Sequence, residues 1–318
     1  MKTFLHHKLR INLIQQLELC RPSSVLLAFS GGQDSLCLLK LCIDMQNKYN
    51  FNIGIVHIDH QLRKDATINT NHIINIIKAL QIKSYIYQIK DSSYSEQTCR
   101  DTRYQIILQT ARIHGYKYIA TAHSASDRIE TFIYNLTRGS SMDGLNSIIW
   151  SRNINCNMKL IRPILNFTRQ EIGWFCRYFA LPVWSDYSNI NYQHSRNRIR
   201  QELIPYLKKY LNKDAEKHIT TCLELLYMDS EYIRQNTIKI YQHVKHPVFI
   251  AINHPHLLNQ HYSIQIRVLR LFFKHNLNIY TSHILLKKII LNMQKDTKEE
   301  IAHNSIIIRY NKTWLYVS

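Results

Sequence analysis

The sequence is short of acidic residues, glycine, paired cysteines and long apolar runs, and these shortages exclude several kinds of protein. It has 22 Asp and Glu against 41 Lys and Arg in 318 residues, which gives a formal charge of +19. No apolar run approaches the roughly 18 residues that a membrane-spanning helix needs. Hydrophobic residues make up 45% of the chain, enough to bury a core, so wholesale disorder is excluded.

The seven cysteines do not form a framework. Their number is odd and no two have CxxC spacing, which argues against a disulfide scaffold, a zinc knuckle or a cluster site. The first twenty residues carry charges and glutamine throughout and lack both a continuous apolar segment and a transit-peptide composition. We therefore expect a protein with no membrane segment that works in the reducing compartment where it is made.

The excess of positive charge favours a polyanionic partner, nucleic acid before membrane, because no basic amphipathic helix stands out. The alternative is a compositional bias. The chain is rich in Ile, Asn, Lys and Tyr and has only 7 glycines, as expected from an AT-rich genome.

The first half of the chain alternates strand-like and helix-like segments. This alternation predicts βαβ units, a parallel sheet and right-handed crossovers, and therefore an α/β fold. Ligands bind beyond the carboxyl ends of such strands, so the residues that follow each strand matter most. The expected strands are Ser24–Phe29, Ile53–Ile58, Tyr85–Ile89 and Tyr118–Thr121, and the expected helices are Leu36–Met45, Ala66–Leu80, Asp101–Ile113 and Asp127–Leu136.

The second half is predicted to be mainly helical, with some strands at its end. Thr168 and Glu171 have the spacing of a capping box, which predicts a helix from there to about Phe179. Residues 196–245 have helical spacing that is interrupted near Pro205. Strand-like 247–252, helices at 263–276 and 282–294, and a terminal hairpin complete the prediction. We expect a catalytic domain over residues 1–208 and a smaller, basic, mainly helical α+β domain over 209–318.

The segment Ser30-Gly31-Gly32-Gln33-Asp34-Ser35 lies between the first expected strand and the first expected helix. Two glycines permit a tight turn, and the free amides and serine hydroxyls of a helix start attract an anion. The pattern is neither a Walker A motif nor GxGxxG. A carboxylate in an anion loop makes sense if Asp34 holds Mg²⁺, which bridges to phosphate oxygens. The alternative is an ordinary turn with capping side chains.

This hexapeptide resembles the SGGxDS signature of PP-loop ATP pyrophosphatases, which cleave ATP to AMP and pyrophosphate. Further segments resemble, in order, the motifs of tRNA(Ile)-lysidine synthetases within that superfamily. They are Val56–Arg63, Arg100–Tyr104, Thr121–Thr131, Arg138-Gly139, Arg162–Leu165, Asp186–Asn189 and Ser195–Pro205. The last 110 or so residues carry no matching motif.

The resemblance implies a two-step reaction on the wobble cytidine of an isoleucine tRNA with a CAU anticodon. ATP adenylates the oxygen on carbon 2 of the cytosine, and the amine of lysine then displaces AMP. Codon reading changes from AUG to AUA. The implied cofactors are ATP and Mg²⁺, the implied partners are this tRNA and L-lysine, and a homodimer is possible. The C-terminal domain is expected to grip tRNA through phosphates.

The resemblance also assigns roles to residues. Asp127 and Glu130, on one helix face at i and i+3, would bind lysine. The residues expected to act in catalysis are Asp34, His123 and Arg138. Those expected to bind ATP are Ser30, Gly31, Gly32, Gln33, Asp34, Ser35, His57 and Arg103, with Mg²⁺ at Asp34. Those expected to contact tRNA or ATP are Arg196, Arg198 and Arg200.

The segment Thr121–Thr131 departs from the family pattern at three positions. Ser124 replaces a histidine, Ser126 an aspartate and Arg128 a glutamine. Arg128 would be an unfavourable cation beside a cationic substrate unless it points to phosphate. A metal site at His57, Asp59 and His60 is an alternative, but further ligands at metal spacing are lacking.

Two other functions stay open at this point. One is a different PP-loop enzyme that thiolates tRNA, although such enzymes usually need paired cysteines. The other is a tRNA-binding protein on a decayed scaffold, which the intact loop opposes. Composition and the absence of a targeting segment favour a plastid, with a bacterial cytoplasm as the alternative.

Overall fold

The computed structural model describes residues 2–19, 23–59, 61, 66–89, 96–146, 148–184, 195–295, 300–303 and 306–317. Contacts group the chain into two compact units, Met1–Glu224 and Leu225–Ser318. Each unit has its own sheet and its own apolar core. Parts of two predicted motifs lie outside the described residues. They are His60, Leu62 and Arg63 of the first motif, and Asp186–Asn189 of the second.

The first unit is built on a six-stranded sheet with the order β3-β2-β1-β4-β6-β5. All neighbours are parallel except β5, which is antiparallel to β6. The predicted α/β fold class is therefore confirmed. The strands are β1 Ser23–Ala28, β2 Phe51–Asp59, β3 Lys83–Gln88, β4 Tyr118–Ala120, β5 Ser151–Asn155 and β6 Met158–Ile161.

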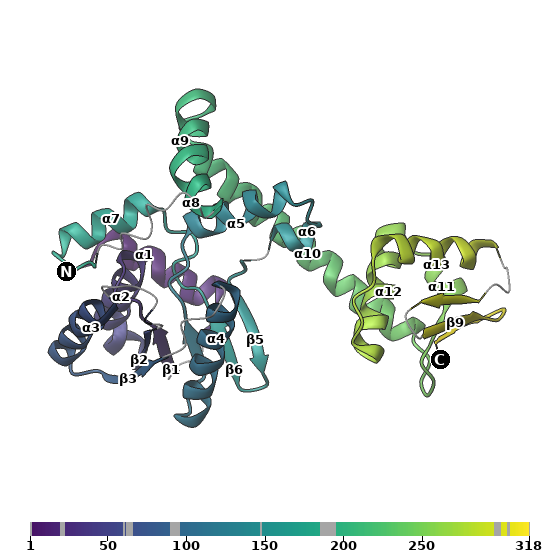
Figure 1. Ribbon diagram of the computed structural model, residues 1–318, viewed down its shortest axis with the longest axis horizontal. Coiled ribbons are helices and arrows are strands. Elements are labelled where there is room, and N and C mark those ends of the chain that lie inside the picture. Colours follow the sequence, from purple (N-terminus) through teal and green to yellow (C-terminus); the bar gives the residue numbers. More distant parts are fainter. Residues whose placement is uncertain are drawn as a thin grey trace. The chain divides into compact units, whose positions relative to one another are not determined.

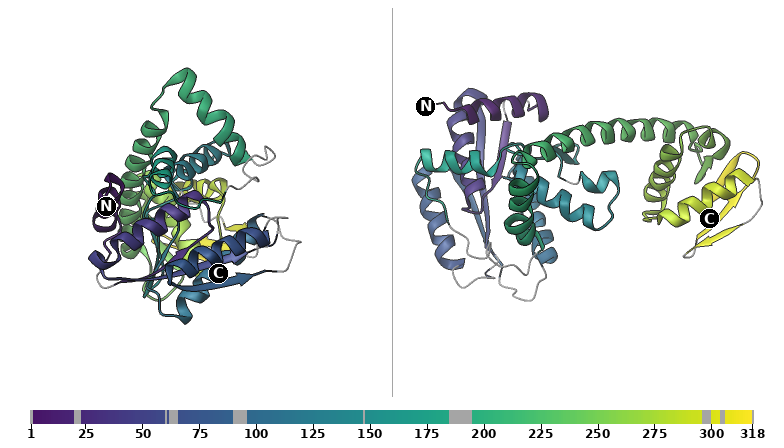
Figure 2. Two further views of the ribbon diagram at one scale, coloured as in Figure 1. Left: turned by 90° about the vertical axis from the view of Figure 1, so that its left-hand side faces the viewer. Right: turned by 90° about the horizontal axis from the view of Figure 1, so that it is seen from above.

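Helices cover both faces of this sheet (Figures 1 and 2). Leu27 and Ile55 are adjacent in β1 and β2 and face the core shared with α1, α2, α3 and α7. Because side chains alternate along a strand, Leu26 and Val56 point to the opposite face of the sheet. Helix α4 covers that face. These helices are α1 Phe4–Ile11 with η1 Asn12–Gln16, α2 Gln33–Tyr49, α3 Ala66–Leu80, α4 Glu96–Ile113, α5 Ala125–Thr137, α6 Met142–Leu145 and α7 Arg169–Tyr178.

One glycine in the central strands is required by packing. Gly54 lies in β2, and a Cβ atom there would be 2.0 Å from the hydroxyl oxygen of Tyr116. Tyr116 is buried in the core beneath α4 and has no room to retreat. A side chain at position 54 would therefore displace it.

A helical segment follows the first sheet. It runs through α8 Ser195–Arg198, η3 Ile199–Leu203, α9 Ile204–Tyr206 and η4 Leu207–Leu211, and then α10 Ala215–Val244. The predicted interruption near Pro205 is wrong, because the backbone stays helical on both sides of Pro205, which lies just after the π-helical η3 passes into α9. The helical backbone ends at Asn212, which has an extended conformation. The expected domain boundary after 208 lies in η4, whereas contacts divide the chain within α10, after Glu224.

The second unit combines helices with a small antiparallel sheet of order β7-β10-β9-β8. The expected strand over 247–252 is mostly wrong, since only Ala251–Asn253 form β7 and the residues before it bend. The terminal hairpin is confirmed as β9 Ile306–Tyr310 and β10 Trp314–Val317. The other elements are α11 His254–Leu258, α12 Tyr262–Leu277, α13 His283–Lys295 and β8 Ile301–His303. In neither unit do the described helices include one long and apolar enough to cross a membrane.

Candidate active site at the carboxyl end of the parallel sheet

The loop between β1 and α2 is tightly constrained. Gly31 has a φ of +77°, and a Cβ atom there would lie 2.9 Å from Cγ1 of Ile73 in α3. Both facts require glycine. The Ser35 hydroxyl donates to the carbonyl oxygen of Gly32 at 2.9 Å and lies 3.1 Å from Oγ of Ser30. The loop therefore presents the amides that begin α2, an arrangement that binds anions.

Residues outside the loop also contact its backbone. The backbone N–H of Trp184 donates to the carbonyl oxygen of Gly31 at 3.2 Å. The side-chain amide of Gln33 lies against α7, where a Cβ atom on Gly173 would be 2.9 Å from Gln33 Nε2. The thiol of Cys176, also in α7, lies 3.5 Å from the carbonyl oxygen of Gln33. Gln33 thus packs α2 on α7, and its side chain is not turned toward the loop.

Asp34 lies in the first turn of α2, within electrostatic reach of charged groups from three other segments. Burial and the negative charges of Asp127 and Glu130 raise its pKa to about 6, against the opposing effect of Arg169 and Arg200. These influences come from α5, α7 and η3, so residues far apart in sequence meet at Asp34. The fold thus brings both carboxylates of α5 within electrostatic reach of Asp34.

His57 lies at the end of β2 and is 5% exposed. Its Nδ1 donates to the carbonyl oxygen of Phe29 at 2.9 Å. Burial lowers its pKa, and the charge of Arg103 acts in the same direction, so the ring is neutral at physiological pH. Its buried Nε2 has no hydrogen-bond partner among the described residues. An acceptor nitrogen therefore lies beside the loop, within electrostatic reach of Arg103 on α4.

Asp59 follows His57 but does not join it as a metal ligand. The backbone N–H of Gln61 donates to Asp59 Oδ1 at 2.9 Å, and the hydroxyl of Thr70 donates to Oδ2 at 2.9 Å. Both carboxylate oxygens therefore fasten the end of β2 to the start of α3. The described residues therefore do not support a metal site at His57 and Asp59.

Asp127 is oriented by the residue that departs from the family pattern. Ser124 is the N-cap of α5, and both its backbone N–H and its hydroxyl donate to Asp127 Oδ2, at 2.8 and 3.1 Å. This is one half of a capping box. Oδ1 is turned toward Arg200, whose Nη2 lies 3.7 Å away. Asp127 thus has one oxygen used for capping and the other directed at the cluster around Asp34.

Glu130 is 3% exposed and is bound on both oxygens by one arginine. Nε of Arg200 donates to Oε1 at 2.6 Å and Nη2 donates to Oε2 at 3.0 Å. Burial raises the pKa of Glu130, and the hydrogen bonds and charge of Arg200 oppose that rise. In return, Glu130 raises the pKa of Arg200 despite the burial of the guanidinium. This bidentate pair connects α5 to η3.

His123 lies just before α5 and shares a hydrogen bond of 2.9 Å between its Nδ1 and the Thr121 hydroxyl. Burial lowers its pKa to about 4, while Asp127 acts in the opposite direction. The charges of Arg162, Arg100 and Arg196 lower it further. A neutral imidazole is therefore surrounded by cations, which suits a place where anionic groups bind.

The two remaining departures do not place a cation in the substrate region. Arg128 is buried at 2% exposure, and its Nη2 donates to the carbonyl oxygen of Leu223 in α10 at 3.0 Å. It also lies 3.4 Å from Oδ1 of Asn146. Arg128 thus connects α5 to α10 through the backbone of Leu223. Ser126 lies within the first turn of α5.

The other predicted arginines are spread over the first unit. Arg196 lies within electrostatic reach of His123, as noted above. Arg198 is exposed and pairs with Glu202 at 3.2 Å. Arg138 follows α5 and its Nη1 lies 3.2 Å from the Tyr134 hydroxyl. It is about 16 Å along the helix axis from Asp127, so the structure does not bring Arg138 to the cluster.

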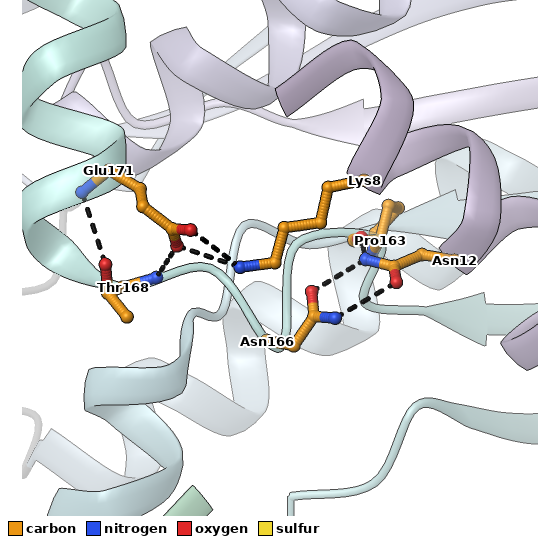
Figure 3. Close-up of polar contacts among 6 residues, drawn as sticks. All are labelled: Lys8, Asn12, Pro163, Asn166, Thr168 and Glu171. Carbon is orange, nitrogen blue, oxygen red and sulfur yellow. Dashed lines mark hydrogen bonds and ion pairs between the residues drawn. The ribbon is translucent and has the colours of Figure 1, made fainter. Parts of the chain in front are cut away.

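The structure adds one arginine that the sequence analysis missed. Arg169 is the first residue of α7 and acts on both Asp34 and Glu130. Its neighbours fix this helix start, as Figure 3 shows. Thr168 and Glu171 form the predicted capping box, with bonds of 2.7 and 3.2 Å, and Lys8 donates to both oxygens of Glu171 at 2.9 Å. The sequence signal was the position of Arg169 directly after an N-cap.

A pair of asparagines holds the chain just before this helix (Figure 3). The side-chain nitrogen of Asn12 donates to the carbonyl oxygen of Pro163 and to Oδ1 of Asn166, both at 2.8 Å. Asn166 returns a bond of 3.1 Å to Asn12 Oδ1. The N-terminal helix, which the sequence analysis did not predict, thereby positions α7 and with it Arg169.

The residues around Asp34 fit a magnesium ion only in part. Among the described residues there is no group of three or more His, Cys, Asp and Glu able to hold a metal. Mg²⁺, however, usually takes one or two carboxylates and completes its shell with phosphates and water. A carboxyl whose pKa is raised by burial and by neighbouring carboxylates gains from a nearby cation. Asp34 is the donor that fits such a site.

Comparison with known proteins agrees with this arrangement. Residues 5–207 match the PP-loop domain family. The fold is also similar to the U34-tRNA thiolase NcsA from Methanococcus maripaludis, with a TM-score of 0.58 at 17% identity, over 70% of this chain and 77% of that chain. At that identity the likeness concerns the fold alone. The chain is thus a PP-loop protein.

Sequence relatives narrow the family. The chain is 41% identical to the chloroplastic tRNA(Ile)-lysidine synthase of Gracilaria tenuistipitata var. liui, over 99% of both chains. It is 38% identical to that of Pyropia yezoensis over 99% of this chain and 96% of the other. It is 44% identical to the tRNA(Ile)-lysidine synthase of a Nostoc strain over 66% of this chain and 62% of the other. The chain belongs to the tRNA(Ile)-lysidine synthase family.

Proposed function

We propose that this protein attaches L-lysine to carbon 2 of the wobble cytidine of a CAU-anticodon isoleucine tRNA, in a reaction that consumes ATP. Family membership over nearly the whole chain supports the proposal. The observation that carries it is the meeting of the anion loop with Asp34, Asp127 and Arg200 at one end of the sheet. A nucleotide phosphate site and a site for a cationic amine thereby share one surface.

The proposed reaction has two balanced steps. The oxygen on carbon 2 of the cytosine attacks the α-phosphorus of ATP, and pyrophosphate leaves. An amine of lysine then attacks carbon 2, and AMP leaves with that oxygen while the amine loses a proton. The amides of the loop and the surrounding arginines stabilise the charge that develops on the phosphates. A close carboxylate or His123 is the proposed acceptor of the amine proton.

The carboxylates of α5 have different proposed roles. Asp127 has one oxygen directed at the cluster, so it is the proposed partner of the ammonium group of lysine. Glu130 has both oxygens bound by Arg200, so its proposed role is to hold that guanidinium in place. Asp34 would hold Mg²⁺, which supplies positive charge to the phosphates when bound. Arg138, which lies far from this cluster along α5, is the least supported of the expected catalytic residues.

The test is lysine incorporation into RNA. Purified protein, Mg²⁺, ATP, labelled lysine and a CAU-anticodon isoleucine tRNA transcript are mixed, and labelled RNA is counted. Incorporation should disappear with Asp34→Ala and with a transcript whose wobble base is not cytidine. Asp229→Asn, a change at an exposed aspartate of α10, should leave it unaltered. AMP release that depends on tRNA but without lysine incorporation would point to another nucleophile, such as sulfur. Binding without any turnover would indicate a non-catalytic tRNA-binding protein.

We propose a plastid as the site of action. Relatives named as chloroplastic align with almost the entire chain, which supports this location, and a bacterial cytoplasm is the alternative. The homodimer stays a prediction, and sedimentation of the purified protein tests it. The second unit is the proposed grip on tRNA outside the anticodon, with an affinity that falls steeply between low and moderate salt.

A further inference from the structure

Residues 195–211, which we call the helical arm, lie across α5 in the first unit (Figure 1). One side of the arm is accounted for by packing. Ile199 and Ile204 are buried against Ile129 and Ile133 of α5, and Leu207 adds to the same cluster. A helix whose apolar residues serve only the fold would have a polar opposite side.

Four other apolar or aromatic side chains of the helical arm are exposed instead. Leu203, Tyr206, Tyr210 and Leu211 are 37%, 56%, 62% and 73% exposed. The two tyrosine rings lie together, with centroids 4.9 Å apart. Nζ of Lys209 lies 5.0 Å from the centre of the Tyr210 ring. Exposed apolar groups gathered in this way mark a binding surface rather than a core.

The charge around this surface identifies the kind of partner. Between residues 195 and 217 there are seven basic side chains and three acidic ones. Two of the basic groups make ion pairs within the segment, Arg198 with Glu202 and Lys208 with Glu216. The remaining excess is positive. Aromatic rings flanked by cations are the combination that binds unpaired nucleotides, because bases stack on rings while cations meet phosphates.

The helical arm is physically continuous with the active site. Arg200, which binds Glu130, is part of its π-helical segment η3, and the tyrosines follow in α9 and η4. Wide turns of this kind often occur at functional sites. The tyrosines thus belong to the same helical stretch as a side chain that acts on Asp34.

We propose that Tyr206 and Tyr210 form a stacking platform for unpaired nucleotides of the RNA substrate, with Lys209 contacting the backbone beside them. This inference rests on the proposed function for the identity of the RNA. It goes beyond that function by assigning an RNA-contacting surface outside the catalytic cluster. The platform would hold nucleotides that flank the base undergoing reaction.

The experiment measures binding of a CAU anticodon stem-loop RNA by the full-length protein. Tyr206→Leu and Tyr210→Leu retain apolar bulk and helix propensity but remove the rings, and Tyr→Phe at each position retains them. Each leucine variant should weaken binding at least fivefold, and each phenylalanine variant less than twofold. Binding of a fully paired RNA duplex should be unaltered in all of them, since it offers no base to stack. Circular dichroism checks that these exposed substitutions leave the fold intact.

Tyr232→Leu is the matched control, because this tyrosine is 69% exposed on the helix α10 and lies outside the arm. Equal affinities for the stem-loop in wild type and both arm leucine variants would overturn the proposal. So would an equal loss in Tyr232→Leu, or a change in oligomeric state of the arm variants, which would indicate a protein interface. Lysine incorporation by the wild type is measured separately. If it fails while the leucine variants lose stem-loop binding, only the proposed function is refuted.

Discussion

The Arg200–Glu130 pair is expected to stabilise the first unit in a way that depends on pH. Arg200→Met leaves Glu130, which is 3% exposed, without the guanidinium that binds both its oxygens. Removing one partner of a buried pair typically costs about 3–5 kcal/mol, because the other charge stays buried and uncompensated. The carboxyl can escape this cost by taking up a proton.

Protonation of Glu130 sets an upper limit on the loss of stability caused by Arg200→Met. Starting from the ordinary glutamate pKa of 4.5, holding the carboxyl neutral costs about 3.4 kcal/mol at pH 7 and about 0.7 kcal/mol at pH 5. Without Arg200, the folded-state pKa of Glu130 rises further above its unfolded value. Stability from such a group is present at low pH and is lost as pH rises. The destabilisation by Arg200→Met should therefore grow from below about 1 kcal/mol at pH 5 to at most about 3 kcal/mol at pH 7, since the pKa of Glu130 is already raised with Arg200 present.

Urea unfolding at pH 5 and pH 7, followed by circular dichroism, measures this difference. The matched control is Arg198→Met in the same helical arm, where Arg198 and Glu202 are 63% and 52% exposed. It should cost less than about 1 kcal/mol at both pH values. The double variant Glu130→Leu with Arg200→Met should recover most of the loss, since no buried charge remains. A cost for Arg200→Met that equals the control, or that is the same at both pH values, would refute the reasoning.

Three further predictions concern the loop and α5. Asp34→Asn should abolish lysine incorporation. It should also raise the free energy of unfolding by up to about 3 kcal/mol above pH 6, because a pKa raised from 3.8 to about 6 means that folding disfavours the carboxylate. This gain should vanish below pH 4, and urea unfolding at a series of pH values measures it. Gly31→Ala should lower stability by about 1–3 kcal/mol and weaken ATP binding measured by calorimetry, and adding Ile73→Val should recover only part, since the positive φ stays. Arg128→Met should leave the KM for lysine within about twofold of wild type in steady-state assays, because this side chain points to Leu223; a large rise in KM would contradict the described orientation.

Local sequence determined the parts of this protein that depend on near neighbours. The alternation of strands and helices, the loop around Gly31 and the capping box at Thr168 all appear in the structure where the spacing predicted them. A glycine with positive φ, or a hydroxyl three residues before a carboxylate, needs no distant partner. The same logic failed at Pro205, because a proline where π-helical turns pass into α-helical turns and a proline that ends a helix look alike in sequence.

Tertiary structure alone decided which charges meet. The i, i+3 spacing of Asp127 and Glu130 places both on one side of α5, but only packing shows that Arg200 binds both oxygens of Glu130. Arg128, one residue beyond Asp127, turns to α10 instead of the site. Arg169 reaches Asp34 because α7 is anchored to the N-terminal helix. Helical periodicity fixes directions around one helix axis, whereas the orientation of that helix comes from contacts between residues far apart in the chain.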